Sequence, residues 1–395
     1  MQLAVIPPLR RPLRPEIASS PVRDRLASII EETAVDLLDP ERIATLADDL
    51  RLVERQRVHH AGLVVAAVVL SAMQRSTDTE GRWLDAQRTY EALGGAEGGK
   101  TAFRGQIRKL VPVMRELLRR RLEAMAAACS DDALRGRLRQ FADVLIPDGS
   151  AFKIAAALSN VYAGTSQPAE FKLHAVYSAR TGGAASIKTT AGSVHDSDGF
   201  HPERWVENAL YIWDLAFVSH ERFVAAASAG AHVLQRLKTG ANPVVIASYG
   251  QTGARRALST EDGKPLRLNE ACEFGDVHQQ RLLDLDVEID DDLGRAVIAR
   301  VVCVPFGEDR YYITTLPRAI FTPYDVAELY RMRWEVELFF RGWKGALRLD
   351  EVKRLQHPVS LDAAITASLL AATLAQRLTV AVNELERRES EATSP

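Results

Sequence analysis

The chain has 395 residues, enough for about two or three domains around sizeable hydrophobic cores. Its 47% hydrophobic and 26% charged content describes an ordinary soluble protein, and its net charge of −2 counts against a general nucleic-acid coat. Three scattered cysteines without metal spacing and the lack of a signal peptide predict a cytoplasmic protein. The most apolar segment, residues 61 to 73, is too short to span a bilayer and predicts a core helix rather than a membrane contact.

The first third of the chain is predicted to be an arm followed by helices. Residues 1 to 20 are rich in proline and arginine, and residues 21 to 135 carry helix signals throughout, such as Asp39-Pro40 at a helix start. A long helix is expected from about 101 to 128, bent at Pro112, with an apolar side and a basic side. The basic side predicts a DNA-binding region, whose candidate phosphate contacts include Arg104, Arg108 and Lys109.

A phosphate-loop pattern precedes that basic helix. Residues 94 to 101 match G-x4-G-K-[ST], but a nucleotide-binding loop must follow a buried strand, and residues 83 to 93 favour a helix. The match is therefore interpreted as a glycine-rich turn between two helices.

The pattern changes to mixed strands and helices at about residue 141. A short apolar strand ends at Asp148, another ends at Asp214, and Ser219 caps a helix. The other elements expected here are strands over residues 171–180, 185–192 and 232–237, and a short helix over 202–208. Residues 240 to 320 are β-rich and irregular, residues 357 to 387 are helical, and residues 388 to 395 form a polar tail.

A helix beginning before Tyr330 carries the most informative spacing. Tyr330, Arg333, Glu337 and Lys344 fall within roughly a 60° arc of one continuous helix. A carboxylate among cations can hold a divalent metal while its neighbours bind phosphates. The simpler interpretation is a surface helix with i,i+4 ion pairs such as Arg333–Glu337.

Two strands ending in Asp148 and Asp214 would bring those carboxylates together, and the helix with Glu337 could add a third. Three carboxylates need a counter-charge, which two Mg²⁺ ions could supply, and two metals suit in-line displacement at phosphorus. Asp196 and Asp198 are rivals for the second carboxylate, although they are expected in a loop, where acids often serve turns.

Asp148, Asp214 and Glu337, the last within Tyr-x2-Arg-x3-Glu-x6-Lys, resemble the Asp-Asp-Glu transposases of bacterial insertion sequences. The group that fits is insertion-sequence family four, and the likeness extends over about residues 20 to 380. The contexts of residues 146–150, 214–223 and 234–238 also resemble that family, although Leu215-Ala216 stands where many members have Arg-Gly.

The resemblance implies an α/β fold with a split ribonuclease-H-like catalytic domain, residues 140–239 and 321–356, interrupted by a β-rich insertion over 240–320. It implies that Asp148 bridges two Mg²⁺ ions, for which Mn²⁺ can substitute, while Asp214 and Glu337 each hold one. Tyr330, Arg333, Lys344 and Lys238 would bind DNA.

The implied function is cut-and-paste transposition by a nucleoid-associated homodimer that acts on double-stranded transposon ends and target DNA. Two alternatives remain open: a related metal-dependent nuclease without strand transfer, and a non-catalytic DNA-binding relic of a transposase.

Overall fold

The computed structural model describes residues 38–51, 59–73, 79–127, 134, 136–202, 204–238, 240–249, 255–257, 263–273, 282–306, 308–347, 352 and 354–392. The predicted arm over residues 1–20 lies outside the described residues.

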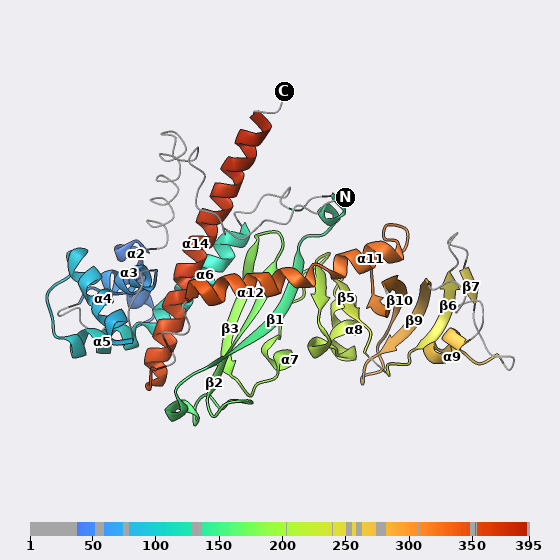
Figure 1. Cartoon of the computed structure of the whole chain (residues 1–395), viewed down its shortest axis with the longest axis horizontal. Coiled ribbons are helices and arrows are strands. Elements are labelled where there is room, and N and C mark those ends of the chain that lie inside the picture. Colours follow the sequence, from blue (N-terminus) through green and yellow to red (C-terminus); the bar gives the residue numbers. More distant parts are fainter. Residues whose placement is uncertain are drawn as a thin grey trace.

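The described elements before residue 128 are helices, which gather at one end of the molecule beside a long C-terminal helix (Figure 1). Asp39 caps the first of them by accepting the backbone N–H groups of Glu41 and Arg42, as its place before Pro40 predicts. The apolar run from residue 61 is a core helix, also as predicted. The helices are α2 (Pro40–Asp49), α3 (Ala61–Ala72), α4 (Thr79–Ala92), α5 (Lys100–Lys109) and α6 (Val111–Ala127).

The prediction of one bent helix from residue 101 to 128 is wrong, because Leu110 separates α5 from α6. Pro112 lies in the first turn of α6, where its missing N–H would have no helical partner in any case. The glycine-rich segment before α5 is a turn between two helices, as predicted, and Gly94 has a positive φ of 89° there.

The remainder of the described chain is built on one mixed, eleven-stranded sheet in the order β3-β2-β1-β4-β5-β11-β10-β9-β6-β7, with β8 paired to β6. Strands β1, β4 and β5 run parallel to one another, whereas β2 pairs antiparallel with β1. The strands are β1 (Val144–Lys153), β2 (Glu170–Ser178), β3 (Gly183–Ala191), β4 (Leu210–Trp213), β5 (His232–Arg236), β6 (Val244–Tyr249), β7 (Arg255–Ala257), β8 (Leu266–Arg267), β9 (Leu283–Asp290), β10 (Ala296–Phe306) and β11 (Glu308–Thr314).

The strands of the predicted β-rich segment continue the same sheet. Strand β11 pairs antiparallel with β5, with Tyr312 opposite Arg236. The segment therefore extends the edge of the sheet that carries β4 and β5, which is an α/β arrangement consistent with a ribonuclease-H-like domain.

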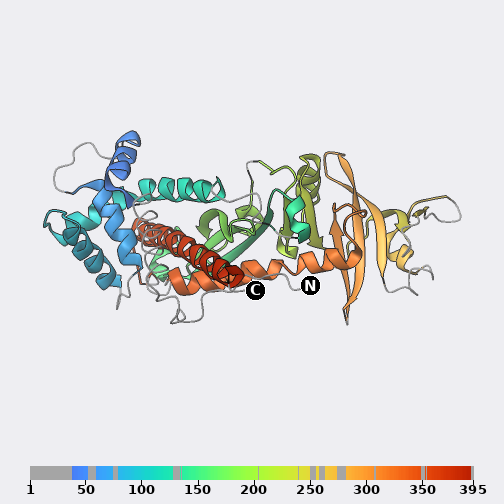
Figure 2. The same cartoon turned by 90° about the horizontal axis from the view of Figure 1, so that it is seen from above.

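Helices cover both faces of the sheet (Figures 1 and 2). Leu210 and Ile212 of β4 lie in the core beneath α11 (Pro323–Tyr330), α12 (Arg333–Leu347) and α14 (Pro358–Ala392), whereas Tyr211 and Trp213 lie in the core beneath α8 (His220–Ser228) and α9 (Leu268–Glu273). This alternation follows from the two-residue period of a strand. Ser219 caps α8, as predicted.

Three local predictions are wrong. Strand β1 does not end at Asp148, because its pairing with β2 continues as far as Lys153 opposite Glu170. Residues 204–208 form bends and turns instead of a helix. The helix around Tyr330 is two helices, α11 and α12, which lie nearly end to end across one face of the sheet (Figure 1).

Helix α14 contains the only stretch in the described chain, Pro358–Gln376, that is long and apolar enough to cross a membrane. Within the protein 78% of that stretch is buried, and α14 packs against α3, α5, α6 and α12. The helix therefore has the surroundings of a core helix.

Candidate functional site

Asp148 and Asp214 lie at the same level on neighbouring parallel strands. Val144 of β1 is opposite Leu210 of β4, so that each aspartate follows its paired residue by four positions. Asp148 has the same parity as Val144 and Ile146, whose side chains belong to the core on the α12 face. Asp214 follows the last residue of β4 directly, as predicted, and accepts the N–H of Leu215 at 2.8 Å.

Arg333, at the start of α12, connects two of the three predicted carboxylates. Its Nη2 donates to Glu337 Oε1 at 2.7 Å, one helical turn away. Its Nη1 lies 3.6 Å from Asp214 Oδ2. Burial opposes the charge of Arg333, but Asp214 and Glu337 outweigh that effect and raise its pKa. The i,i+4 ion pair of Arg333 with Glu337 is thus present, and Arg333 also lies close to Asp214 at the end of β4.

The negative charge of Asp148 is only partly balanced by its surroundings. Burial raises its pKa from 3.8 to about 6, and the nearby charges of Asp196 and Asp214 also act to raise it, against the hydrogen bond from Gly149 and the charge of Arg333. The N–H of Gly149 donates to Asp148 Oδ1 at 2.8 Å. A buried carboxylate repelled by two others has an unmet need for positive charge.

The excess negative charge at Asp148 raises the question whether these residues could hold a divalent metal ion. Within the described ranges, no three His, Cys, Asp or Glu side chains are arranged to hold a metal ion, and Glu337 is engaged by Arg333. The donor chemistry nevertheless fits, because Mg²⁺ prefers carboxylate oxygens and the charge of Asp214 adds to the need of Asp148 for a cation.

Tyr330 ends α11 and is buried, and its hydroxyl has no hydrogen-bond partner among the described residues. Its ring centroid lies 5.1 Å from that of Tyr312 on β11. Burial first, and Asp214 second, raise the pKa of Tyr330, while Arg333 and Arg236 oppose the rise. The phenol thus faces the same charges as Asp214, although it belongs to a different helix from Arg333.

Arg236 is a candidate site residue that the spacing of charged residues did not reveal. It follows Gln235, which is opposite Trp213 across the parallel pair of β4 and β5, and this places Arg236 level with Asp214. Its side chain is exposed. The signal was its position two residues before Lys238, but its register with β4 cannot be read from the chain.

Asp196, the predicted rival, begins the short helix α7 (Asp196–Gly199) rather than lying in a loop. Its Oδ1 is 3.3 Å from Lys172 Nζ and 3.8 Å from His174 Nδ1. A Cβ on Gly149 would come within 2.1 Å of the same oxygen, so Asp196 packs directly against β1 beside Asp148. Asp198 is exposed, and it accepts a hydrogen bond from Ser197 within the same short helix.

The predicted DNA-binding cations have different surroundings. Arg108 donates from Nε to Ser360 Oγ of α14 at 2.8 Å, whereas Lys109 and Lys238 are exposed. Arg104 is half-buried on α5. The side chain of Lys344 lies outside the described residues, although its backbone belongs to α12.

Several arginines of the predicted basic helix are paired with acids. Arg119 and Arg120 both bind Glu116, and Arg115 binds Asp362 of α14 at 3.0 Å. The basic side of α6 is therefore partly neutralised within the protein.

Comparison with known proteins gives a consistent result. A family model described as "Transposase DDE domain" matches residues 139–374, which is more than half of the chain. The chain is 42% identical over 141 residues to the transposase for insertion sequence element IS421 of Escherichia coli, covering 36% of each protein. It is 35% identical over 51 residues to the transposase for insertion sequence element IS1151 of Clostridium perfringens, covering 13% of this chain and 11% of the relative. The alignments thus span about a third or less of those relatives. On the family match, the chain belongs to the DDE transposase domain family.

Proposed function

We propose that this protein is an insertion-sequence transposase that binds the terminal inverted repeats of its element, cleaves the DNA at the ends and joins the 3′-OH ends to target DNA. The observation that carries the proposal is the register of β1 and β4, which puts Asp148 level with Asp214, beside the helix that carries Arg333 and Glu337. The names of the relatives and the family match support the same interpretation.

In this proposal Asp148, Asp214 and Glu337 hold Mg²⁺, with Mn²⁺ as a substitute. When bound, the metal ions supply an activated attacking oxygen and a stabilised leaving oxygen at phosphorus. The protein's own contribution is positional. Strands β1 and β4 fix the two aspartates on rigid elements, and Arg333 neutralises Asp214 and Glu337 in the protein alone.

Cations around the carboxylates would bind the DNA backbone. Arg333 can present a planar fork to one phosphate, and Lys344 a point charge to another. Arg236 and Tyr330 lie beside Asp214 and can add donors at the same place. Lys238, Arg104, Arg108 and Lys109 would extend this contact along the duplex.

The larger organisation proposed here has an arm (1–20), a helical DNA-binding region (21–135), a split catalytic domain (140–239 and 321–356), a β-rich insertion (240–320) and a C-terminal helical region (357–387). The tail predicted from residue 388 is wrong in its start, because helix α14 continues to Ala392. Because an element has two ends, the working unit would be a homodimer on synapsed DNA. Its place would be the bacterial cytoplasm, at the nucleoid.

The experiment is to incubate the protein with its own element's ends, target DNA and Mg²⁺, and to map the products. Asp148→Ala, Asp214→Ala and Glu337→Ala are each expected to abolish cleavage while end binding persists. Asp198→Ala, an exposed acid near the site, is the matched control and should cleave normally.

The products also separate the alternatives. Cleavage without joining would identify a nuclease, and binding without cleavage by the unsubstituted protein would identify a relic. Full activity of Asp214→Ala with loss of activity in Asp196→Ala would transfer the second carboxylate to Asp196.

A further inference from the structure

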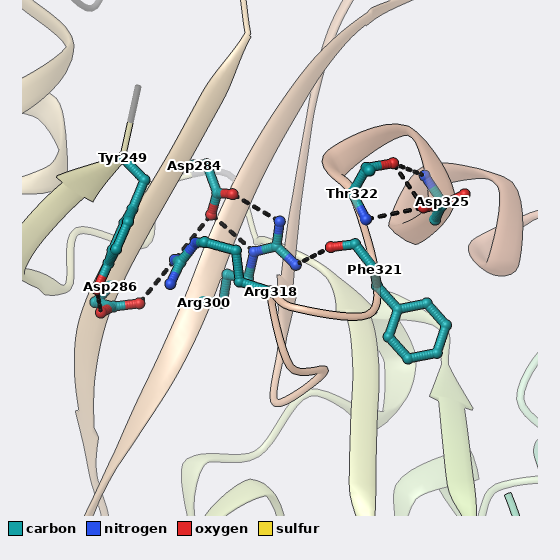
Figure 3. A network of polar contacts seen from close by, with 8 residues as sticks. All are labelled: Tyr249, Asp284, Asp286, Arg300, Arg318, Phe321, Thr322 and Asp325. Atoms are coloured by element: carbon teal, nitrogen blue, oxygen red, sulfur yellow. Dashed lines mark hydrogen bonds and ion pairs between the residues drawn. The ribbon is translucent and has the colours of Figure 1, made fainter. Parts of the chain in front are cut away.

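A network of buried charges connects the strands of the β-rich insertion to the start of α11 (Figure 3). It is called here the Arg300 network. Its members are Tyr249 of β6, Asp284 and Asp286 of β9, Arg300 of β10, Arg318 and the backbone carbonyl of Phe321.

Arg300 is the centre of this network and is only 4% exposed. Its Nε and Nη2 donate to the two oxygens of Asp284, at 2.7 and 2.6 Å. Its Nη1 donates to the carbonyl oxygen of Phe321 at 2.6 Å. One guanidinium therefore joins a strand of the insertion to a backbone atom outside it, with the planar geometry that only arginine offers.

Arg318, three residues before Phe321, also binds the segment before α11 to strand β9. Its Nη2 donates to Asp284 at 2.9 Å and to Asp286 at 2.8 Å. Its guanidinium carbon lies 3.4 Å from the centre of the Tyr249 ring, and the Tyr249 hydroxyl donates to Asp286 at 2.7 Å. The segment from β11 to α11 is thus held at residues 318 and 321 by strands β6, β9 and β10.

Phe321 is the last residue before the cap of α11. Its side chain is fully buried and stacks on Phe141, with ring planes 10° apart. Thr322 then caps α11 in a reciprocal capping box with Asp325 (Figure 3). A displacement of the Phe321 carbonyl would therefore be transmitted to the first turn of α11.

Helix α11 is coupled to α12 by a tight junction. The N–H groups of Met332 and Trp334 both donate at 3.0 Å, to the carbonyls of Leu329 and Arg331 respectively. With these i→i+3 hydrogen bonds, only the two-residue turn of Arg331 and Met332 separates α11 from α12. Arg333 and Glu337 follow at once on α12, so that the position of α11 determines where they meet Asp214.

We propose that the Arg300 network sets the position of α11 and α12 over the sheet, and that Arg300 is a positioning residue for Arg333 and Glu337. The inference rests on the proposed function, in which those two residues act at the DNA end. The β-rich insertion would then hold α12, the helix with Arg333 and Glu337, in place, in addition to extending the sheet.

The use of a buried charged pair, Arg300 and Asp284, instead of apolar side chains supports a positioning role for Arg300. Burying Arg300 and Asp284 costs desolvation that apolar residues on adjacent strands would avoid. Apolar side chains would stabilise the insertion equally well, but they could not bind the Phe321 carbonyl in a fixed direction.

The test compares Arg300→Lys with Arg295→Lys in the full-length protein. Lysine keeps the charge beside Asp284, but it cannot fork onto Asp284 and reach the Phe321 carbonyl together. Arg295 is the control, because it binds Asp291 through Nε and Nη2, at 2.7 and 2.6 Å, and these contacts stay within the β9–β10 hairpin, whereas Arg300 also reaches the Phe321 carbonyl. Single-turnover cleavage with saturating protein, the affinity for element ends, and hydrogen exchange of residues 323–347 are measured for each variant.

Arg300→Lys is expected to slow cleavage by about tenfold or more, because a small misplacement of catalytic groups is costly, while end affinity stays within about twofold. Hydrogen exchange of α11 and α12 should accelerate, and Arg295→Lys should match the unsubstituted protein in all three measurements. Equal losses in both variants, a cleavage loss no larger than the loss of end binding, or unchanged exchange in Arg300→Lys would overturn the inference.

Failure of the proposed function gives a different result. If the unsubstituted protein does not cleave, that function is lost, and the exchange of residues 323–347 still decides whether Arg300 fixes α11 and α12.

Discussion

Replacing Asp148 by asparagine should stabilise the metal-free protein while it removes the proposed cleavage. The folded protein holds the pKa of Asp148 at about 6, above the ordinary value of 3.8, first because the carboxyl is buried. Ionisation in the folded state is therefore unfavourable. The resulting loss in the free energy of unfolding is absent below pH 3.8, grows between pH 3.8 and about 6, and reaches its full size above that range.

The size of the effect follows from the same values. At about 1.4 kcal/mol for each pKa unit, a rise from 3.8 to about 6 corresponds to about 3 kcal/mol at pH 8. An asparagine in place of the acid would avoid that penalty and keep a similar volume. The free energy of unfolding of D148N should therefore exceed that of the unsubstituted protein by up to about 3 kcal/mol at pH 8, and by almost nothing near pH 3.5.

Urea unfolding without divalent metal measures this difference. Intrinsic tryptophan fluorescence is a suitable signal, because three of the five tryptophans, Trp83, Trp213 and Trp343, are buried. Asp143→Asn is the control: burial also raises the pKa of Asp143, but that acid accepts hydrogen bonds from Ser178 and Arg180, so its replacement should destabilise the protein at pH 8. A loss of stability in Asp148→Asn at pH 8, or an equal gain at both pH values, would refute the reasoning.

Three further predictions concern packing, DNA binding and capping. Gly149→Ala should destabilise the protein by about 1–3 kcal/mol, because the new methyl group would meet Asp196 Oδ1 at 2.1 Å; urea unfolding should show a smaller loss when Asp196→Ala is also present, and additive losses would count against this contact. Lys344→Ala should weaken end binding and reduce the slope of log K against log salt by about 1 in titrations at several salt concentrations, and an unchanged slope would remove its phosphate role. Ser219→Ala should cost about 1 kcal/mol in urea unfolding, because the serine hydroxyl caps α8 by accepting the N–H of Arg222, and Ser219→Asp should retain most of that stability; equal losses in both would disprove the cap.

The sequence predicted correctly those helix and strand ends that depend only on residues nearby in the chain. Asp214 was placed correctly because a short apolar strand, Leu210–Trp213, stops immediately before it. Ser219 was placed correctly because a cap depends on its own helix. The glycine-rich turn before α5 was also local, because its glycines end one helix and precede the next.

Elements set by distant partners were not predicted. Strand β1 extends beyond Asp148 because β2, which lies further along the chain, continues to pair with it, and the small residues Gly149, Ser150 and Ala151 after the acid hide that pairing. The break between α11 and α12 contains no glycine or proline, so no sequence signal marks it.

For the candidate site, the sequence pointed to Asp148, Asp214 and Glu337, and their joint action stays a prediction, whereas one neighbouring cation was not foreseen. Arg236 acquires its place beside Asp214 from the pairing of β4 with β5, which residue spacing does not reveal. The sequence likewise gave no sign that Asp284 and Asp286, within an acidic run, are neutralised inside the protein by Arg300 and Arg318.

The central claim is that Asp148, Asp214 and Glu337 act together around shared divalent ions. The most direct measurement is anomalous diffraction from crystals of the protein bound to its element's end and Mn²⁺. The account predicts two peaks about 4 Å apart, both touching Asp148, with Asp214 and Glu337 each touching one. Peaks that avoid Asp148, or that are held by Asp196 in place of Asp214, would contradict it.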